Sequence, residues 1–568
     1  NSLRDRLKVA GANENIMDSF LNRVNSDAHL IANMTYGKTI SDAYVKMKDE
    51  LKEFRGKHGS ASLVNSVTTT FNELEKRHLQ MMERKPHTGF DTLSEGLRSA
   101  NTHFSLTFKP MFYVQNALQP WMMTAPVLAG RFGMGPSHGA LLEAYQNYGV
   151  IFGNAFSNAG SIAEKLKAFG NLTKQIENSK LLKTGEKNML EEMERRNLLD
   201  LGAQQEFGSF IGDNAFSKAV NRVTTEIGVA TRGVEIMNRF AAALSGYRLQ
   251  KARLIKDGMT EAQAHEAAKE YAAELLSLTQ GDYSAQNAPS AFNTRIGKLA
   301  LQFRKFQAIQ FNFFAHLMKG AVKNMSPEEK AIARKQLAIA MATHFAMAGF
   351  KGLPAVSALA AILGGMFGDE DEEPEDWFRK MCAENGIAKE FVDLILEGVP
   401  SLLGVNLSDS IGAGTMASIA PYTRKDFNKE GGMKELLINL AGAPISRILR
   451  IHDGWTQSNW ETNSWRPLIE AGLPAGIPGI FKAAGILDAT VDKRTGAKFL
   501  SDEDFGLTDR LLLAMGATPK VLEDMYRMRG QVRRTQEWGT QQSGEIKARF
   551  INTRRGNNWK EINEIYRD

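Results

Sequence analysis

Cysteine is nearly absent from this chain, since Cys382 is the single one in 568 residues. One cysteine cannot form an intramolecular disulfide or a zinc site built from cysteines, and such scarcity is typical of synthesis in a reducing compartment. Lys380 lies nearby in sequence, but a thiolate nucleophile also needs a well-placed histidine. We therefore expect Cys382 to be a buried or an idle thiol.

Motifs for nucleotide binding and metal chemistry are also missing. No Gly-x-x-x-x-Gly-Lys-Ser/Thr loop occurs, and the ten histidines are dispersed without a His-Glu-x-x-His pair. Gly412-Ala-Gly414 lacks the third glycine of a dinucleotide-binding fingerprint. We expect no catalytic residues, no cofactor and no metal, and hence a structural protein rather than an enzyme. An enzyme whose site assembles from distant residues stays open as a rival.

Neither sign of charge is in large excess. Lysine and arginine total 70 against 64 acidic residues, and a net charge of +6 is too small for this length to indicate a nucleic-acid coat. The chain begins at Asn1 instead of Met and shows no charged-then-apolar leader. These features suggest a trimmed fragment without a secretory signal of its own, so that an exported role would need another delivery route.

Helix-forming sequence is what the chain has in abundance. Runs rich in Ala, Leu, Glu, Lys, Gln and Met dominate, whereas alternating β-branched and aromatic stretches joined by Asn-Gly or Asp-Gly turns are missing. We predict an all-α fold, an extended multi-helical protein with long amphipathic helices, an apolar helical hairpin and little or no β-sheet.

Composition divides the chain into four regions. Residues 1–92 predict an N-terminal helical arm or bundle, and residues 93–335 a central helical domain. Residues 336–450 predict an apolar hairpin, an acidic linker and an amphipathic segment. Residues 451–568 combine a Gly/Pro/Trp-rich region of poor helix-forming sequence with basic C-terminal helices.

Local signals within the central region predict individual elements. Thr260 is expected to cap a helix that runs to about Thr279. The Gly/Ser-rich stretch 133–139 predicts a loop, and the charged stretch 162–201 a solvated helical hairpin. Three residues on a helix over 225–256 share one face as a local ladder of ion pairs, namely Arg232, Glu235 and Arg239.

A long helix is expected from Ser290, and its apolar residues fall in one stripe at 100° per residue. The stripe consists of Leu299, Phe303, Phe306, Phe313 and Leu317. Phe311 and Phe314 lie beside it, so that the apolar face is wide enough to meet more than one neighbour. Such a stripe is more often a packing seam than a ligand site, and we take these five residues as candidates for a seam between subunits.

Residues 337–368 are largely apolar, with Lys351 and Pro354 between two halves. Each half is shorter than the roughly 20 residues that a helix needs to span a bilayer, so a simple transmembrane helix is not expected. Two interpretations of the resulting hairpin stay open, a buried structural hairpin and one that contacts a membrane. The candidate membrane-contact residues are Leu337, Phe345, Leu353, Ile362 and Phe367.

Two charged segments complete the pattern. Residues 369–376 form an acidic run, which is normally a solvated loop and would also suit control of contact with an anionic membrane or a basic partner. After Gly530, basic residues are interleaved with aromatic ones, which suits DNA phosphates and stacked bases. The alternative is a solvated helix whose acidic residues dilute the charge. The nucleic-acid candidates are Arg533, Arg534, Arg549, Arg554 and Arg555.

A series of short motifs resembles a known family. Residues 109–133 contain Asn116-x-x-Gln119, Pro126-x-Leu128 and Gly133, a pattern similar to that of large internal virion proteins of short-tailed bacteriophages with a PLxRFG domain. Where the literal Pro-Leu-x-Arg-Phe-Gly string would stand, this chain has Leu301-Gln-Phe-Arg-Lys-Phe306. The match covers about residues 95–450 in the expected order, and its further motifs are Glu235-x-x-Asn238-Arg239, the turn from Tyr283 to Pro289, and the stretch from Gly398 to Ser408.

The resemblance implies a protein that is packed inside the capsid near the portal and expelled with or before the genome. Proteins like these assemble into rings or tubes through the host periplasm and reach the inner membrane. The implied partners are further copies of the chain and other ejection or portal-proximal proteins. The implied location is the virion interior and, after infection, the host periplasm and inner membrane. A DNA-binding internal core protein, which organises the genome without forming a channel, is the alternative.

Overall fold

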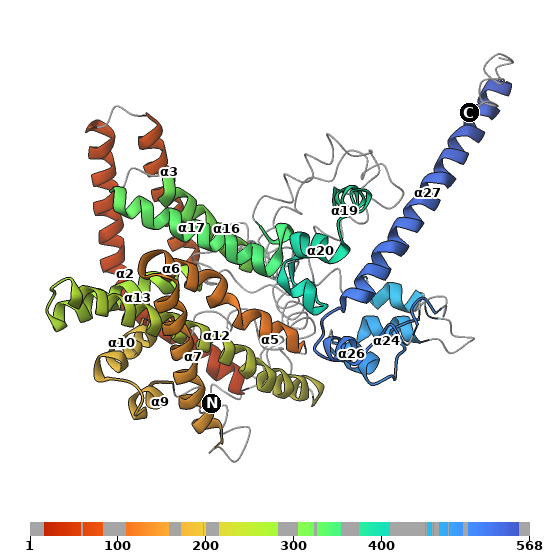
Figure 1. Ribbon diagram of the computed structural model, residues 1–568. Helices are drawn as coiled ribbons and strands as arrows, with labels where there is room; N and C mark the ends of the chain where they lie inside the picture. The colour runs from red at the N-terminus through yellow and green to blue at the C-terminus, as the bar shows by residue number, and fades with distance from the viewer. Residues whose placement is uncertain are drawn as a thin grey trace, which may run out of the picture.

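The computed structural model describes residues 16–57, 61–82, 109–157, 215–281, 305–322, 326–353 and 374–408 and, with short gaps, 172–199 and 449–555. Helices account for 82% of the described residues, and no strand occurs among them. The all-α prediction is confirmed. Figure 1 shows a body of packed helices from which the last helix, α27, projects.

The N-terminal helices pair with each other in an antiparallel hairpin. They are α2 (Ile16–Lys57) and α3 (Ala61–Met82). The Tyr44 hydroxyl donates to the Leu74 carbonyl at 3.2 Å, and Arg55 Nη2 donates to the Thr68 hydroxyl at 2.9 Å. The partner residue numbers fall as those of α2 rise, which establishes the antiparallel direction.

A first hydrophobic core lies around the long helix α12. The helices that enclose it are α7 (Met134–Ser157), α9 (Leu172–Asn178), α10 (Thr184–Arg195), α12 (Ala215–Lys256) and α13 (Glu261–Thr279). The Thr260 hydroxyl accepts a hydrogen bond from the Gln263 amide, so this residue caps α13 as predicted. Phe240 and Leu276 are fully buried between these helices.

Two local predictions in this region are wrong. The expected loop at 133–139 is helical from Met134 onward, because Pro136 lies in the first turn of α7, where its missing amide proton costs no hydrogen bond. The charged stretch 162–201 is not fully solvated, since α10 buries Met189 and Leu190 in the first core. The prediction failed because the many charged residues of this stretch lie on one face of the helix, while its opposite face is apolar.

A second hydrophobic core packs residues 110–132 against residues 305–348. It is formed by α5 (Pro110–Ala117), the π-helical turn η2 (Pro120–Thr124), α6 (Ala125–Phe132), α16 (Lys305–Val322) and α17 (Pro327–Ala348). Helix α17 runs unbroken through residues 335 and 336, where a domain boundary was predicted. That boundary is therefore wrong, because apolar residues from both sides of it enter the same core.

The chain after α17 crosses itself closely at two glycines. The elements are η3 (Phe350–Gly352), α19 (Pro374–Glu384), α20 (Lys389–Glu397) and η4 (Val399–Leu403). Gly349 and Gly398 have φ angles of 60° and 80°. A Cβ atom on Gly349 would lie 2.3 Å from the Glu397 amide nitrogen, so only glycine permits this approach. The crossing brings Glu397 next to Lys351.

The C-terminal region has a small core of its own. Its helices are α24 (Arg466–Gly472), α25 (Ile477–Ala483), α26 (Leu507–Ala514) and α27 (Lys520–Arg555). Leu513 and Leu522 are buried in this core. The expectation of poor helix formation here is wrong for α24 and α25, because Pro467 and Pro478 each occupy a first-turn position.

Candidate functional site

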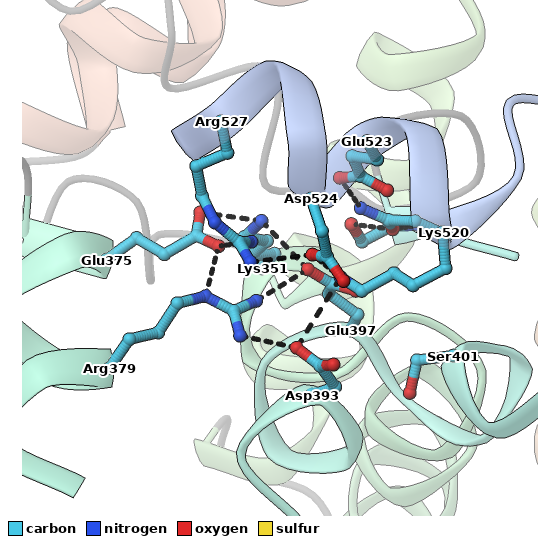
Figure 2. Close-up of polar contacts among 12 residues, drawn as sticks. Lys351, Glu375, Arg379, Asp393, Glu397, Ser401, Lys520, Glu523, Asp524 and Arg527 are labelled. Carbon is cyan, nitrogen blue, oxygen red and sulfur yellow. Dashed lines mark hydrogen bonds and ion pairs between the residues drawn. The ribbon is translucent and has the colours of Figure 1, made fainter. Parts of the chain in front are cut away.

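A cluster of charged residues, buried at its centre and partly exposed at its edges, joins the crossing to the base of α27. We call it the charge cluster, and Figure 2 shows its side chains converging from η3, α19, α20 and α27. Its members are Lys351, Glu375, Arg379, Lys389, Asp393, Glu397, Lys520, Asp524 and Arg527.

Glu397 lies at the centre of the charge cluster. Its side chain has no solvent exposure, yet it meets three cations. Arg379 Nη2 lies 2.8 Å and Lys351 Nζ 3.4 Å from its Oε1, and Lys520 binds its Oε2. A carboxylate without access to water is stable only when cations and hydrogen-bond donors replace its hydration, and these three residues supply both.

Asp393, one turn earlier on α20, is the second shared carboxylate. Arg379 binds it directly, and Lys389 Nζ lies 2.7 Å and Lys520 Nζ 3.5 Å away. Burial by itself would raise the pKa of Asp393, but the hydrogen bonds from Lys389 and Arg379 lower it to about 2. Asp393 is therefore ionised throughout the neutral range.

Glu375 and Asp524 extend the charge cluster toward α27. Glu375 lies 2.6 Å from Lys351, 2.9 Å from Arg379 and 3.5 Å from Arg527. Burial favours a raised pKa for Glu375, but the charges of Lys351 and Arg379 lower it overall. Asp524 pairs with Arg527 at 2.6 Å and with Lys389 at 2.7 Å.

These contacts correct the expectation for the acidic run 369–376. Its last residues, Glu375 and Asp376, lie in the first turn of α19 rather than in a solvated loop. Acidic side chains in a first turn complement the helix dipole. The basic partner of Glu375 lies in the same chain, since it pairs with cations from η3, α19 and α27.

The charge cluster holds elements together and is poorly suited to proton transfer. The carboxylates of Glu375 and Asp393 have lowered pKa values and are matched by cations. Glu523 differs, because burial raises its pKa while Asn406 donates to it at 2.8 Å. In the part of the chain that the structure describes, no three His, Cys, Asp or Glu residues form a group able to hold a metal ion.

A second buried network, the polar core, connects motifs of the family resemblance. Asn238 Nδ2 donates to the Asn116 carbonyl at 2.8 Å, and the Tyr145 hydroxyl donates to Asn238 Oδ1 at 3.0 Å. Asn116 and Asn238 belong to different motifs, 122 residues apart. Their contact fixes α5 against α12.

Arg239 anchors the same network from the next position. Its side chain is 1% exposed and lies 3.3 Å from Glu235, as predicted for this pair of the ladder, whereas the side chain of Arg232 lies outside the described residues. It also donates to the carbonyls of Leu198 at 3.1 Å and Gly281 at 2.8 Å. Arg239 thus holds two connecting segments against α12. The ion pair with Glu235, which helical spacing predicted, is only one of its contacts.

The polar core continues to the end of α13. Gln280 Nε2 donates to the Thr124 hydroxyl at 2.9 Å, and that hydroxyl donates to Thr279 Oγ1 at 2.9 Å. Thr124 ends the π-helical turn, which follows Gln119 of the first motif. The turn therefore directs a buried hydroxyl toward the segment that leads into the motif beginning at Tyr283.

Comparisons with known proteins add no relative. No family model, no curated protein and no solved structure matches this chain. The resemblance to internal virion proteins therefore stands on the order of its motifs in the sequence.

The predicted subunit seam lies partly inside this chain's own second core. Phe313 and Leu317 are 1% and 2% exposed, in a cluster that also contains Ala340 of α17. These two residues cannot contact another subunit while the body is folded, so the prediction is wrong for them. Phe306 lies in the first turn of α16, and Leu299 and Phe303 lie outside the described residues.

Of the five membrane-contact candidates, three lie among the described residues and two lie outside them. Leu337 packs against the second core, Leu353 is buried, and the ring of Phe345 meets that of Phe350 at 5.3 Å. Ile362 and Phe367 lie outside the described residues. None of the described helices combines the length and the apolar character needed to cross a bilayer.

All five nucleic-acid candidates lie on α27, beyond the charge cluster. They are Arg533, Arg534, Arg549, Arg554 and Arg555. Cys382 is 3% exposed and packs with Val392 and Leu396, which confirms the prediction of a buried thiol.

Sequence reasoning missed the charge cluster. The i,i+4 spacing of Glu375 with Arg379 and of Lys389 with Asp393 could have indicated its local pairs. It did not signal that these pairs would meet α27.

Proposed function

We propose that this chain is a structural internal virion protein of a short-tailed bacteriophage, which oligomerises into part of a conduit for genome delivery across the host envelope. The observation that carries the proposal is the ordered set of motifs together with the meeting of two of them in the polar core. Asn116 and Asn238 share a hydrogen bond there, and Arg239 clamps Gly281, just before the third motif. Motif residues that hold one another in place act as a framework, as expected of a structural protein.

The distribution of apolar surface supports an assembling role. The hairpin of α2 and α3 and the distal part of α27 are long helical segments that bear large exposed apolar side chains. Met34 on α2 is 75% exposed, and Val532 on α27 is 58% exposed. Exposed apolar faces on extended elements suit contacts between subunits.

Electron microscopy of the purified chain, with and without anionic liposomes, tests the proposal. We expect rings or tubes, seated on anionic vesicles and sparse on vesicles of neutral lipid. Dispersed monomers next to bare vesicles, under every lipid and partner condition tried, would overturn the conduit proposal.

The arginines on α27 favour a second candidate function, an internal core protein that organises packaged DNA. Arg533→Gln combined with Arg534→Gln should then weaken DNA binding and reduce the slope of log affinity against log salt by about one for each lost phosphate contact. Lys180→Gln, at an exposed position on the body, is the matched control. DNA binding without salt dependence, or equal loss in both variants, would contradict this function.

A further inference from the structure

Among the residues that the structure describes, the side-chain contacts of α27 with the body lie at its base. Lys520, Asp524 and Arg527 enter the charge cluster, and the rings of Tyr526 and Phe499 lie 5.9 Å apart. Farther along the helix, the hydroxyls of Thr535 and Thr540 bond to carbonyls of α27 itself. Figure 1 shows that the distal part of α27 extends away from the other labelled helices.

The distal part of α27 carries an uncharged face, which we call the α27 seam. Three apolar side chains on it, Met528, Val532 and Ile546, are 56%, 58% and 41% exposed. At 100° per residue they fall within about 40° of one another. The positions between them on the same face are Thr535, Gly539 and Gln542. No charged residue therefore occupies this face from 528 to 546.

The spacing of the α27 seam is that of a two-stranded coiled coil. Positions 528, 532, 535, 539, 542 and 546 alternate steps of four and three, which is the a/d pattern of heptads. A helix of this kind gains most of its stability from packing of its apolar face. The seam continues from Met525, which is already half-buried at the base of α27.

We infer that the α27 seam binds the α27 seam of a second copy of this chain, in parallel and in register. In that register Gln542 meets the partner subunit's Gln542, so that two amides can bond to each other within the seam. An antiparallel pair aligned on Met528 and Ile546 would instead place Gln542 against the partner subunit's Val532, leaving a buried amide without a polar partner.

The residues that flank the seam are compatible with this pairing. In a parallel coiled coil each g position faces the e position five residues later on the other helix. Gln531 then faces the partner subunit's Gln536, both uncharged, and no g–e pair along the described length of α27 brings like charges together. Nucleic acid is a poor occupant, because an uncharged face offers nothing to phosphate groups.

This inference rests on the proposed homo-oligomer and names its contact surface. Sedimentation velocity of the full chain over a range of concentrations tests it. Ile546→Glu, and separately Val532→Glu, should raise the dissociation constant about tenfold or more by burying a charge in the seam. Ala548→Glu is the matched control, because Ala548 is exposed on the opposite side of α27 two residues away. It should associate like the unmodified chain, and circular dichroism should show equal helix content in all variants.

Cysteine cross-linking tests the direction of pairing. In a Cys382→Ala background, Val532→Cys should form a disulfide-linked dimer on mild oxidation, since the two copies of position 532 face each other. Preferential linkage between a Val532→Cys copy and a Gln542→Cys copy would overturn the parallel register.

The outcomes separate this inference from the proposed function. Undiminished association of Ile546→Glu and Val532→Glu would overturn the α27 seam while leaving the homo-oligomer proposal intact. A chain that stays monomeric in solution would overturn the seam as well. The conduit proposal would then depend on whether rings still form on anionic vesicles.

Discussion

At the scale of single residues, the molecule places charges where water cannot reach them. Glu397 has no solvent exposure and three cationic neighbours, so its charge and theirs depend on one another. Removing one partner of a buried ion pair leaves the others without compensation.

Glu397→Gln is expected to lower the free energy of unfolding by about 3 kcal/mol, because the shape is kept while Lys351, Arg379 and Lys520 lose their shared anion. Urea denaturation followed by circular dichroism measures the change. Glu143→Gln serves as the control and should have little effect, because the Glu143 carboxylate is exposed and its partner Arg248 keeps its ion pair with Glu186. Equal free energies of unfolding for the two variants would mean that the charge of Glu397 does not stabilise the fold.

His344 is a second buried polar residue, with a different consequence. Its Nδ1 lies 2.9 Å from the Ala340 carbonyl, its ring meets that of Phe314, and its Nε2 has no hydrogen-bond partner among the described residues. Burial lowers the pKa of His344 to about 4, although the bond to Ala340 acts in the opposite direction.

This lowered pKa predicts a loss of stability in acid. Between the ordinary pKa of 6.5 and the folded value of about 4, the unfolded chain binds a proton that the folded chain does not. The contribution of neutral His344 is full above pH 6.5 and falls by about 3 kcal/mol as the pH drops to about 4. His344→Leu should remove this part of the pH dependence in denaturation curves. Parallel curves for both proteins would contradict the prediction.

At the scale of elements, the crossing of Gly349 and Gly398 determines where the charge cluster forms. A Cβ atom on Gly398 would lie 2.7 Å from the Ala346 carbonyl oxygen, and its φ of 80° is one that other residues avoid. Without this close approach, Glu397 could not reach Lys351 on the far side of the crossing.

Gly398→Ala should therefore lower the free energy of unfolding by more than backbone strain alone would, because the added Cβ also meets backbone atoms. Gly386 is a matched control, with a φ of 72° and no atom within 4 Å of an added Cβ. We expect a loss of about 3 kcal/mol for Gly398→Ala and about 1 kcal/mol for Gly386→Ala in thermal or urea unfolding. A similar loss in both would show that the crossing relaxes around the methyl group.

At the scale of the whole molecule, a packed body carries a projecting helix that is fastened by charges. The body buries two large cores around α12 and α17, whereas the distal part of α27 presents its α27 seam to solvent. Elements with little tertiary packing open more readily than those in a core.

Hydrogen exchange should report this difference directly. Amides of residues 531–555 are expected to exchange faster than those near Phe240 and Leu244, which are fully buried on α12. Raising the protein concentration should slow exchange in 531–555 if copies pair through the α27 seam, and Ile546→Glu should abolish that slowing. Mass spectrometry of peptic fragments resolves the two regions. Rapid exchange along α12 would contradict the assignment of the body.

Some of the fold was predictable because it depends on neighbours in sequence. The all-α class follows from helix-forming composition, and the cap at Thr260 follows from a side chain that bonds three residues ahead. The prediction of a loop at 133–139 was wrong because proline, which breaks a helix in its interior, is well tolerated in the first turn.

The site was less predictable, since an apolar stripe does not say what covers it. Phe313 and Leu317 were expected to meet another subunit, but the body of the same chain buries them. The α27 seam has the same kind of spacing and remains exposed. Sequence periodicity is identical in the two cases, and only the path of the chain separates them.

By itself, the sequence determined the helical class, the buried state of its single cysteine, the cap of α13 and the local pairs that helical spacing creates. The tertiary structure decided which of those pairs converge. Lys520 meets Glu397 across 123 residues, and Asn238 meets Asn116 across 122. Hydrogen bonds and ion pairs act over a few ångströms, whereas sequence periodicity shows only which side chains share a face of one helix. Which faces meet is therefore settled by how the cores pack, and that packing placed the charge cluster and left the α27 seam uncovered.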